Sequence, residues 1–317
     1  MTPARNEEFD SPLLLTGPQH SQPRLREALR SWNISGTVGL VSAGWEEDEF
    51  DDAWVRDAVD NTVVNSHLYE FGEQLFVEDP EIIYLLRRRQ DELRKLREVN
   101  KIQLDHLLEI ARELLRREFA GEEVLAETDT TFRQIREVDA LYIDHVYQVI
   151  RKYDKQIEPT SRATVLGFRQ RVLEQLDGCQ ALFIAGGHIG VLLNRLNLSR
   201  LLRHLNVPVI AWSGGAMAMG DKIVFYHHFI PHSSGDAELS RHGMRWFHSL
   251  LLFPAASQRL NLASRVEIAL LARRFSDDFC YAMDEGSEIE WSSQKLVRMD
   301  GINRLSLDGY LVRAILP

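Results

Sequence analysis

Four short apolar runs, each of which ends in or leads into a glycine-containing turn, constrain the fold of this chain more than any other feature. They lie at residues 12–17, 37–44, 180–184 and 207–210, and stretches with helical spacing separate them. Short buried strands that alternate with helices are typical of a mostly parallel sheet covered on both faces. The sequence therefore predicts an α/β protein with such a sheet. Short strands and turns from Cys280 onward are expected to close the sheet edge.

A long region in which apolar residues recur only at helical spacing interrupts this alternation of strands and helices. Leucine, isoleucine and valine recur at helical spacing among dense charges from Asp79 to about Glu118, and a second helical pattern runs from Phe132 to Ile150. A polar break at residues 121–130 separates the two patterns. We expect a long helical hairpin inserted into the α/β domain, with the hairpin at 79–154 and the α/β domain at 1–78 and 155–317.

The apolar stripe of this hairpin has two interpretations. Such a stripe most often packs on its own domain or on a second subunit, and a homodimer is one expectation. Less often it forms an arm that binds a separate partner. The run Arg87-Arg88-Arg89 lies among acidic neighbours, which indicates a solvated helix face.

Composition excludes several classes of protein. Lys and Arg number 37 against 47 Asp and Glu, a formal net charge of −10, which argues against a protein whose main task is to bind nucleic acid. The start of the chain leads into acidic residues, and no stretch is apolar and long enough to cross a bilayer. With only two cysteines, Cys179 and Cys280, we expect a cytoplasmic protein that contacts no membrane.

Ser213 is the candidate nucleophile. It follows the strand-like run 207–210 within Ala211-Trp212-Ser213-Gly214-Gly215, and a helix-compatible stretch comes after it. A serine between a buried strand and a helix, flanked by small residues, can occupy a strained turn that raises its hydroxyl above the sheet. A serine in a glycine-rich turn is more often only a turn, so the position between strand and helix carries this interpretation.

A second glycine pair ends the preceding strand. Gly186 and Gly187 stand in Ala185-Gly186-Gly187-His188, where their backbone N–H groups are candidates for an oxyanion hole together with the N–H of Gly214. The alternative is that both glycines only allow a tight connection between strand and helix.

The order of these motifs resembles the peptidase E (aspartyl dipeptidase) and cyanophycinase family of serine peptidases. The resemblance spans roughly residues 13–44 and 181–275: a Gly-Gly turn, then the Trp-Ser elbow, then a strand end with Pro254 followed by Arg259-Leu260. It implies a class I glutamine amidotransferase-like, flavodoxin-like fold. It also implies a serine in place of the usual cysteine nucleophile, a histidine base, and hydrolysis of a small peptide or amide near an acidic residue, without a cofactor.

The chain departs from the family's pattern at the positions of the catalytic base and of the catalytic acid. The resemblance places the catalytic histidine directly after Pro254, but the residue there is Ala255, which cannot accept a proton. The family's acid is expected between the serine and that position, where Asp221, Asp236 and Glu238 occur without a spacing that selects one of them. A triad without its base loses most of its nucleophile activation.

Other histidines lie near the motifs in the sequence. His188 is on the turn that faces the elbow, and His227 and His228 follow it, so each is a candidate substitute base. A lone histidine is more often structural or exposed. We expect no metal site, because Pro231 interrupts any helix that would align His228 with His232.

Two functions remain open at this point. One is a serine hydrolase that acts on a small peptide or amide, impaired by Ala255. The other is a non-catalytic member that binds a ligand or a partner through its pocket and hairpin. Glutamine amidotransferase activity is set aside, because neither Cys179 nor Cys280 lies at the elbow.

Overall fold

The computed structural model describes residues 4–5, 9–19, 23–226 and 235–316. Within these residues, seven strands form the central sheet, and its five core strands run parallel. In spatial order the strands are β13 (Lys295–Asp300), β12 (Glu288–Ser292), β2 (Leu13–Thr16), β6 (Val209–Trp212), β5 (Ala181–Ile184), β3 (Val38–Val41) and β4 (Val63–Asn65). Strands β12 and β13 extend one edge in antiparallel fashion.

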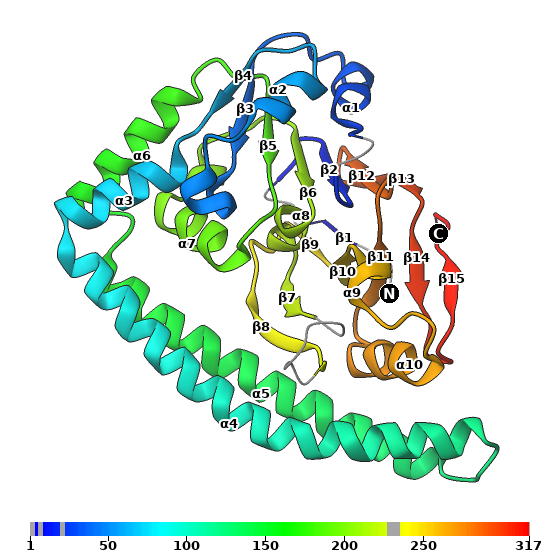
Figure 1. Ribbon diagram of the computed structural model, residues 1–317. Coiled ribbons are helices and arrows are strands. Elements are labelled where there is room, and N and C mark those ends of the chain that lie inside the picture. Colours follow the sequence, from blue (N-terminus) through cyan, green and yellow to red (C-terminus); the bar gives the residue numbers. More distant parts are fainter. Residues whose placement is uncertain (1–3, 6–8, 20–22, 227–234, 317) are drawn as a thin grey trace.

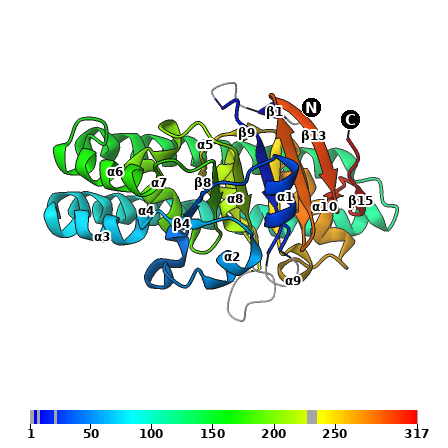
Figure 2. The ribbon, with the colours of Figure 1, turned by 90° about the horizontal axis from the view of Figure 1, so that it is seen from above.

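Both faces of this sheet are buried, which explains the uninterrupted apolar runs of its strands. Leu13 and Leu15 of β2 face one apolar cluster, and Leu14 between them faces another. The first face is covered by α3 (Leu68–Glu78), α6 (Ala163–Gln175), α7 (Ile189–Ser199) and α8 (Gly214–Met219), and the second by α1 (Leu25–Ser31) and α2 (Ala53–Ala58). The predicted α/β class is confirmed, and Figures 1 and 2 show the arrangement.

The C-terminal part of the chain divides between two sheets. Strands β12 and β13 close the edge of the central sheet as expected, but β11 (Phe279–Met283), β14 (Asn303–Leu305) and β15 (Leu311–Arg313) join β10 (Leu250–Pro254) in a second sheet. Strands β10 and β11 are parallel, with Pro254 opposite Met283. Two further ribbons pair β7 (Lys222–Phe225) with β8 (Glu238–His242) and β1 (Ala4–Arg5) with β9 (Phe247–His248).

Two long antiparallel helices, α4 (Pro80–Phe119) and α5 (Leu125–Ile157), form the hairpin. Pro80 begins α4, where its missing N–H costs nothing, and Gly121 takes a positive φ of 92° in the turn between the helices. Figure 1 shows the pair running along one side of the molecule, from α3 to beyond α10 (Arg265–Arg274). The division into an inserted hairpin and an α/β domain stays a prediction, as does a homodimer.

The hairpin packs on the rest of this chain along its length. Ile82 and Val146 belong to the same apolar cluster as the central sheet, whereas Leu108 and Phe132 form a separate cluster with Ala269 and others on α10. No helix in the described ranges has the length and apolar character needed to cross a membrane.

A buried ion pair also joins the hairpin to the body. Arg274 on α10 donates two hydrogen bonds, of 2.6 and 2.8 Å, to the carboxylate of Asp139 on α5, and a third to the carbonyl of Ala237. Arg274 is 3% exposed and Asp139 is 6% exposed, so each charge depends on the other for compensation.

We expect Asp139→Ala to lower the free energy of unfolding by about 3–5 kcal/mol, because it leaves the Arg274 guanidinium buried and uncompensated. Urea unfolding measured by circular dichroism checks this. The matched control is Lys101→Ala, which breaks an exposed pair with Asp105 on α4 and costs less than about 1 kcal/mol. Equal losses in the two variants would contradict the role given to the buried pair.

Candidate functional site

Ser213 occupies the strained backbone conformation that a nucleophile elbow requires. Its φ of 51° and ψ of −124° lie in a region that residues with a side chain rarely adopt. The residue follows β6 directly and precedes α8, and its N–H donates to the carbonyl of Thr16 at the end of β2. Such a conformation costs roughly 1–3 kcal/mol and persists where the surrounding structure holds it in place.

Gly186 lets the neighbouring strand approach this turn closely. A Cβ atom on Gly186 would lie 2.9 Å from the Ser213 Cβ and 3.0 Å from the Gly214 nitrogen. A Cβ on Gly187, whose φ is 100°, would lie 2.2 Å from the carbonyl oxygen of Gly44. The glycine pair therefore serves the close packing of three strand ends, and this packing also brings it against the elbow.

The backbone donors at this junction are unused by the rest of the protein. In the described part of the chain, the N–H groups of Gly186, Gly187 and Gly214 make no hydrogen bond. By contrast, the N–H of His188 donates to the Gly44 carbonyl at 2.6 Å. Free N–H groups beside a serine elbow are the elements from which an oxyanion hole is made. The assignment of these three glycines to an oxyanion hole stays a prediction.

Ala255 lies at the end of β10, the first strand of the second sheet. It is 8% exposed, has an αL backbone (φ 54°, ψ 40°), and donates its N–H to the Met283 carbonyl at 2.8 Å. The hydroxyl of Tyr226 donates to the carbonyl of Pro254 at 2.5 Å and so fixes the strand end before Ala255.

Asp284 is an acid that the sequence analysis missed. It directly follows β11, next to Ala255 across the parallel pair, and its Oδ1 accepts from the N–H and hydroxyl of Ser257 at 3.0 and 2.8 Å. Its backbone also meets the end of β2, because a Cβ on Gly17 would lie 2.0 Å from the Asp284 carbonyl oxygen. Thr16, which precedes Gly17, accepts the hydrogen bond from Ser213. The available signal was an aspartate immediately after an apolar strand, Tyr281-Ala282-Met283.

The three acids considered from the sequence have partners elsewhere. Asp221 binds Arg245 and His242, at 2.8 and 3.2 Å, and Asp236 binds Arg112. Glu238 binds Arg97 at 2.5 Å. The partners of Asp236 and Glu238 lie on α4, so these two pairs help to join the hairpin to the body, whereas the partners of Asp221 lie in the body itself.

His188, the one candidate substitute base within the described residues, is engaged in a helix cap. His188 caps α7, and its Nδ1 accepts from the Val191 N–H at 3.1 Å. In a neutral ring this leaves the proton on Nε2, so the capping bond works against His188 as a base. His227 and His228 lie outside the described residues. No side chain among the described residues makes a hydrogen bond with the Ser213 hydroxyl.

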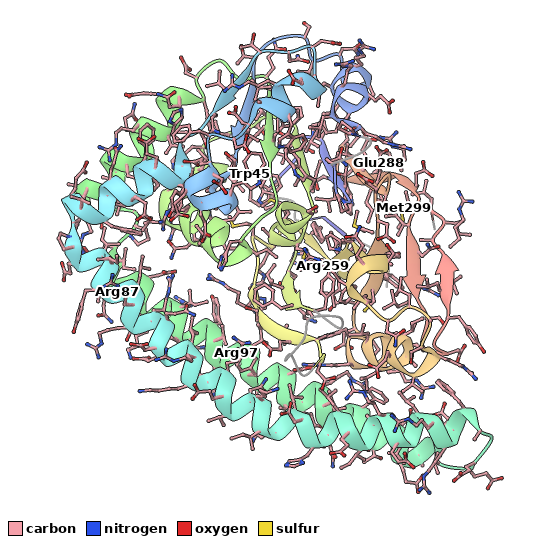
Figure 3. The ribbon with its side chains drawn as sticks, in the orientation of Figure 1. Trp45, Arg87, Arg97, Arg259, Glu288 and Met299 are labelled. Atoms are coloured by element: carbon pink, nitrogen blue, oxygen red, sulfur yellow. The ribbon has the colours of Figure 1, made fainter. Side chains whose placement is uncertain are left out.

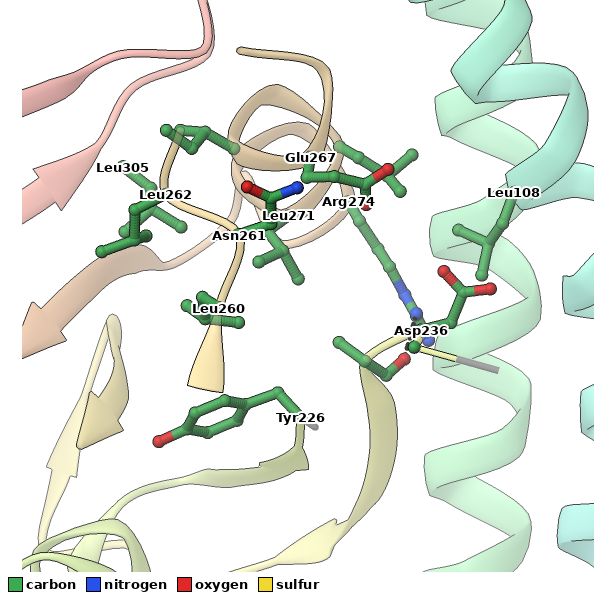
Figure 4. Close-up of a pocket in the computed structure, with 14 residues that line it drawn as sticks. Leu108, Tyr226, Asp236, Leu260, Asn261, Leu262, Glu267, Leu271, Arg274 and Leu305 are labelled. Atoms are coloured by element: carbon green, nitrogen blue, oxygen red, sulfur yellow. Dashed lines mark hydrogen bonds between the residues drawn. The ribbon is translucent and has the colours of Figure 1, made fainter. Parts of the chain in front are cut away.

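A small apolar pocket, of about 20 Å³, lies between α10, the hairpin and the segment after α9 (Ala256–Arg259) (Figure 4). Six leucines line it, with Arg274 and Asp236 on the hairpin side. Tyr226 and Gly235 line it, and residues 227–234 between them lie outside the described residues. None of the described residues that line it belongs to the elbow or to the Gly-Gly turn.

We expect Gly186→Ala to lower the free energy of unfolding by about 1–3 kcal/mol, because its new Cβ overlaps the Ser213 turn. The urea unfolding midpoint checks this. Gly167→Ala is the control: a Cβ there meets nothing within 4 Å, and alanine in the exposed interior of α6 adds up to about 1 kcal/mol. A Gly186→Ala variant as stable as the wild type would show that the two strand ends are not closely packed.

Comparison with known proteins finds no matching family model and no matching curated sequence. Among solved structures, the chain is similar to one described as the crystal structure of a peptidase from an acI-B1 Actinobacterium, with 9% sequence identity and a TM-score of 0.43. The alignment covers 95% of this chain and 92% of that chain.

Proposed function

We propose that this chain is a serine-hydrolase-like protein of the peptidase E and cyanophycinase type, with Ser213 in the nucleophile position. It binds a small peptide or amide and hydrolyses it slowly at most. The observation that carries this proposal is the backbone of Ser213, whose φ of 51° and ψ of −124° occur in a turn between β6 and α8. Strained residues of this kind cluster at functional sites.

The backbone donors near this serine support the proposal. The N–H groups of Gly187 and Gly214 make no hydrogen bond within the described residues, and in the proposed site they stabilise the oxyanion that forms when the Ser213 hydroxyl attacks a carbonyl carbon. Donors that are already fixed in place cost no reorganisation when charge develops on the substrate oxygen. These N–H donors would strengthen the binding of the substrate carbonyl as well as stabilise the transition state.

The proton-transfer part is incomplete. Ala255 stands where the resemblance places the base, and Asp284 stands beside it, where a carboxylate would orient an imidazole. An acid without a base between it and the serine cannot activate the hydroxyl. Hydrolysis is then limited to what the oxyanion donors and substrate positioning provide, roughly 10³–10⁴-fold over the reaction in water.

The side chain of Arg259 is the argument for a ligand that has an acidic group. It ends the short helix α9 that begins directly after Ala255, it is exposed, and its side chain forms no ion pair within the described part of the chain (Figure 3). A guanidinium with no carboxylate partner favours a ligand that has a carboxylate. The proposed ligand is therefore a small peptide or amide with an acidic side chain.

A second candidate function is pure binding, without turnover. It is favoured by one observation: within the described residues, the Ser213 hydroxyl has no side-chain partner that could take its proton. In the first function Ser213 reacts with a substrate, and in the second it does not. One labelling experiment distinguishes the two.

We expect a fluorophosphonate probe to label wild-type protein weakly or not at all, and Ala255→His to raise the labelling rate by roughly 10²–10⁴-fold through general-base assistance. The αL backbone at Ala255 accepts histidine, which is enriched there. In-gel fluorescence over time measures the rate. Asp284→Asn in the Ala255→His background should lower the restored rate, because the imidazole loses the group that orients it.

Ser213→Ala in both backgrounds is the control, and it should abolish all labelling. Strong labelling of the wild type that disappears in Ser213→Ala would overturn the loss of the base and would show that another group activates the serine. An Ala255→His variant that folds but stays unlabelled would overturn the assignment of Ser213 to an elbow aligned with β10.

A further inference from the structure

A second cavity, of about 160 Å³, lies between the hairpin and the α/β body. Its walls come from α4, α5, the C-terminal half of α7, the end of β8 and the segment after β8. Leu86, Val146, Ile150 and Leu198 give it an apolar side. None of the residues that form the Ser213 turn or the Gly186–Gly187 turn lines it, so it is separate from the candidate active site.

Arginine dominates the charge of this cavity. Arg89, Arg151, Arg241 and Arg245 line it, and Asp154 is the one carboxylate among the described residues that do so. Arg245 is bound from outside by Asp221, at 2.8 Å. Four guanidinium groups against these two carboxylates leave an excess of two positive charges, without counting His242, which also lines the cavity.

The two inner arginines lack adequate counter-charge. Arg89 is 8% exposed, and its nearest carboxylate oxygen, on Asp154, is 3.5 Å away. The Arg241 side chain makes no hydrogen bond or ion pair with any other described residue, and its Nε atom is buried. Burial, together with the neighbouring Arg89, lowers the pKa of Arg241 to about 10. Unpaired buried cations destabilise a fold, so their presence calls for a compensating group.

Asp154 cannot neutralise this cluster alone. Burial raises the pKa of its carboxyl group, and Arg89, Arg241 and Arg200 oppose that rise. One carboxylate is thus shared among three guanidinium groups. A ligand with further negative charge would satisfy donors that the protein itself leaves open.

We propose that this cavity binds a small organic anion with two negative charges on one end and an apolar group on the other. Arg89 and Arg241 bind the charged end from inside, Arg151 and Arg245 approach it from the exposed rim, and the leucine, valine and isoleucine side chains contact the apolar group. Guanidinium forks match both phosphate and carboxylate oxygens, so a phosphate monoester and a dicarboxylate share the required chemistry.

Isothermal titration calorimetry with phenyl phosphate and with phthalate, at constant ionic strength, tests this proposal. We expect the wild type to bind at least one of these anions. Arg241→Met should weaken that binding roughly ten- to a hundredfold, through loss of a charge-assisted hydrogen bond. The anion bound more tightly identifies the charged group as phosphate or carboxylate.

The matched control is Arg87→Met, which removes an exposed arginine of the same helix, two residues from Arg89 (Figure 3). It should bind like the wild type. Arg241→Met without ligand should melt no lower than the wild type, because it removes an uncompensated buried charge, whereas a structural arginine would lower the melting temperature.

Arg89→Met, with its fold checked by circular dichroism, gives an independent variant, and it should also bind at least tenfold more weakly. Failure of the wild type to bind either anion would overturn the proposal. Unchanged affinity in both Arg241→Met and Arg89→Met would overturn it as well.

Discussion

The close approach of strands β5 and β6 at their carboxyl ends is the constraint on which the candidate site depends. Parallel neighbours in a buried sheet end at the same edge, so the turns that follow them meet. Here the meeting is possible because Gly186 has no side chain, and a Cβ there would lie 2.9 Å from that of Ser213. The strained serine, the free N–H groups and the end of β2 all take their positions from this contact.

The second sheet brings further strand ends to this edge. Strands β10 and β11 bring Ala255 and Asp284 next to each other, and Gly17 connects Asp284 to the strand beside the elbow. Three strand ends thus meet beside the Ser213 turn, and the position directly after β10 holds the methyl group of Ala255.

The hairpin contributes to the structure through its charged side chains. It is fixed to the body by buried or partly buried pairs such as Arg274 with Asp139 and Arg112 with Glu267, which satisfy their partners well. Two arginines of the cavity differ from these pairs: the buried Nε of Arg241 has no hydrogen-bond partner among the described residues, and Arg89 lies 3.5 Å from the Asp154 carboxylate. The hairpin and the body, which these pairs join, also enclose a cavity with an excess of positive charge.

Local pattern in the sequence determined the central α/β sheet, the two long helices and the location of the serine turn, because burial on both faces and helical spacing leave direct traces in the order of apolar residues. It also showed that Ala255 cannot be a base. It did not reveal Asp284, because that role depends on β10 pairing with β11 in a second sheet, a contact between residues about thirty positions apart.

Nor did it reveal the arginine-lined cavity, since Arg89 and Arg241 lie on elements far apart in the chain and the sequence places Arg89 in a run typical of a solvated helix face. Only the tertiary structure decided which charges are paired and which are left open. Pairing depends on distance in space and on burial, and neither is written in the local order of residues.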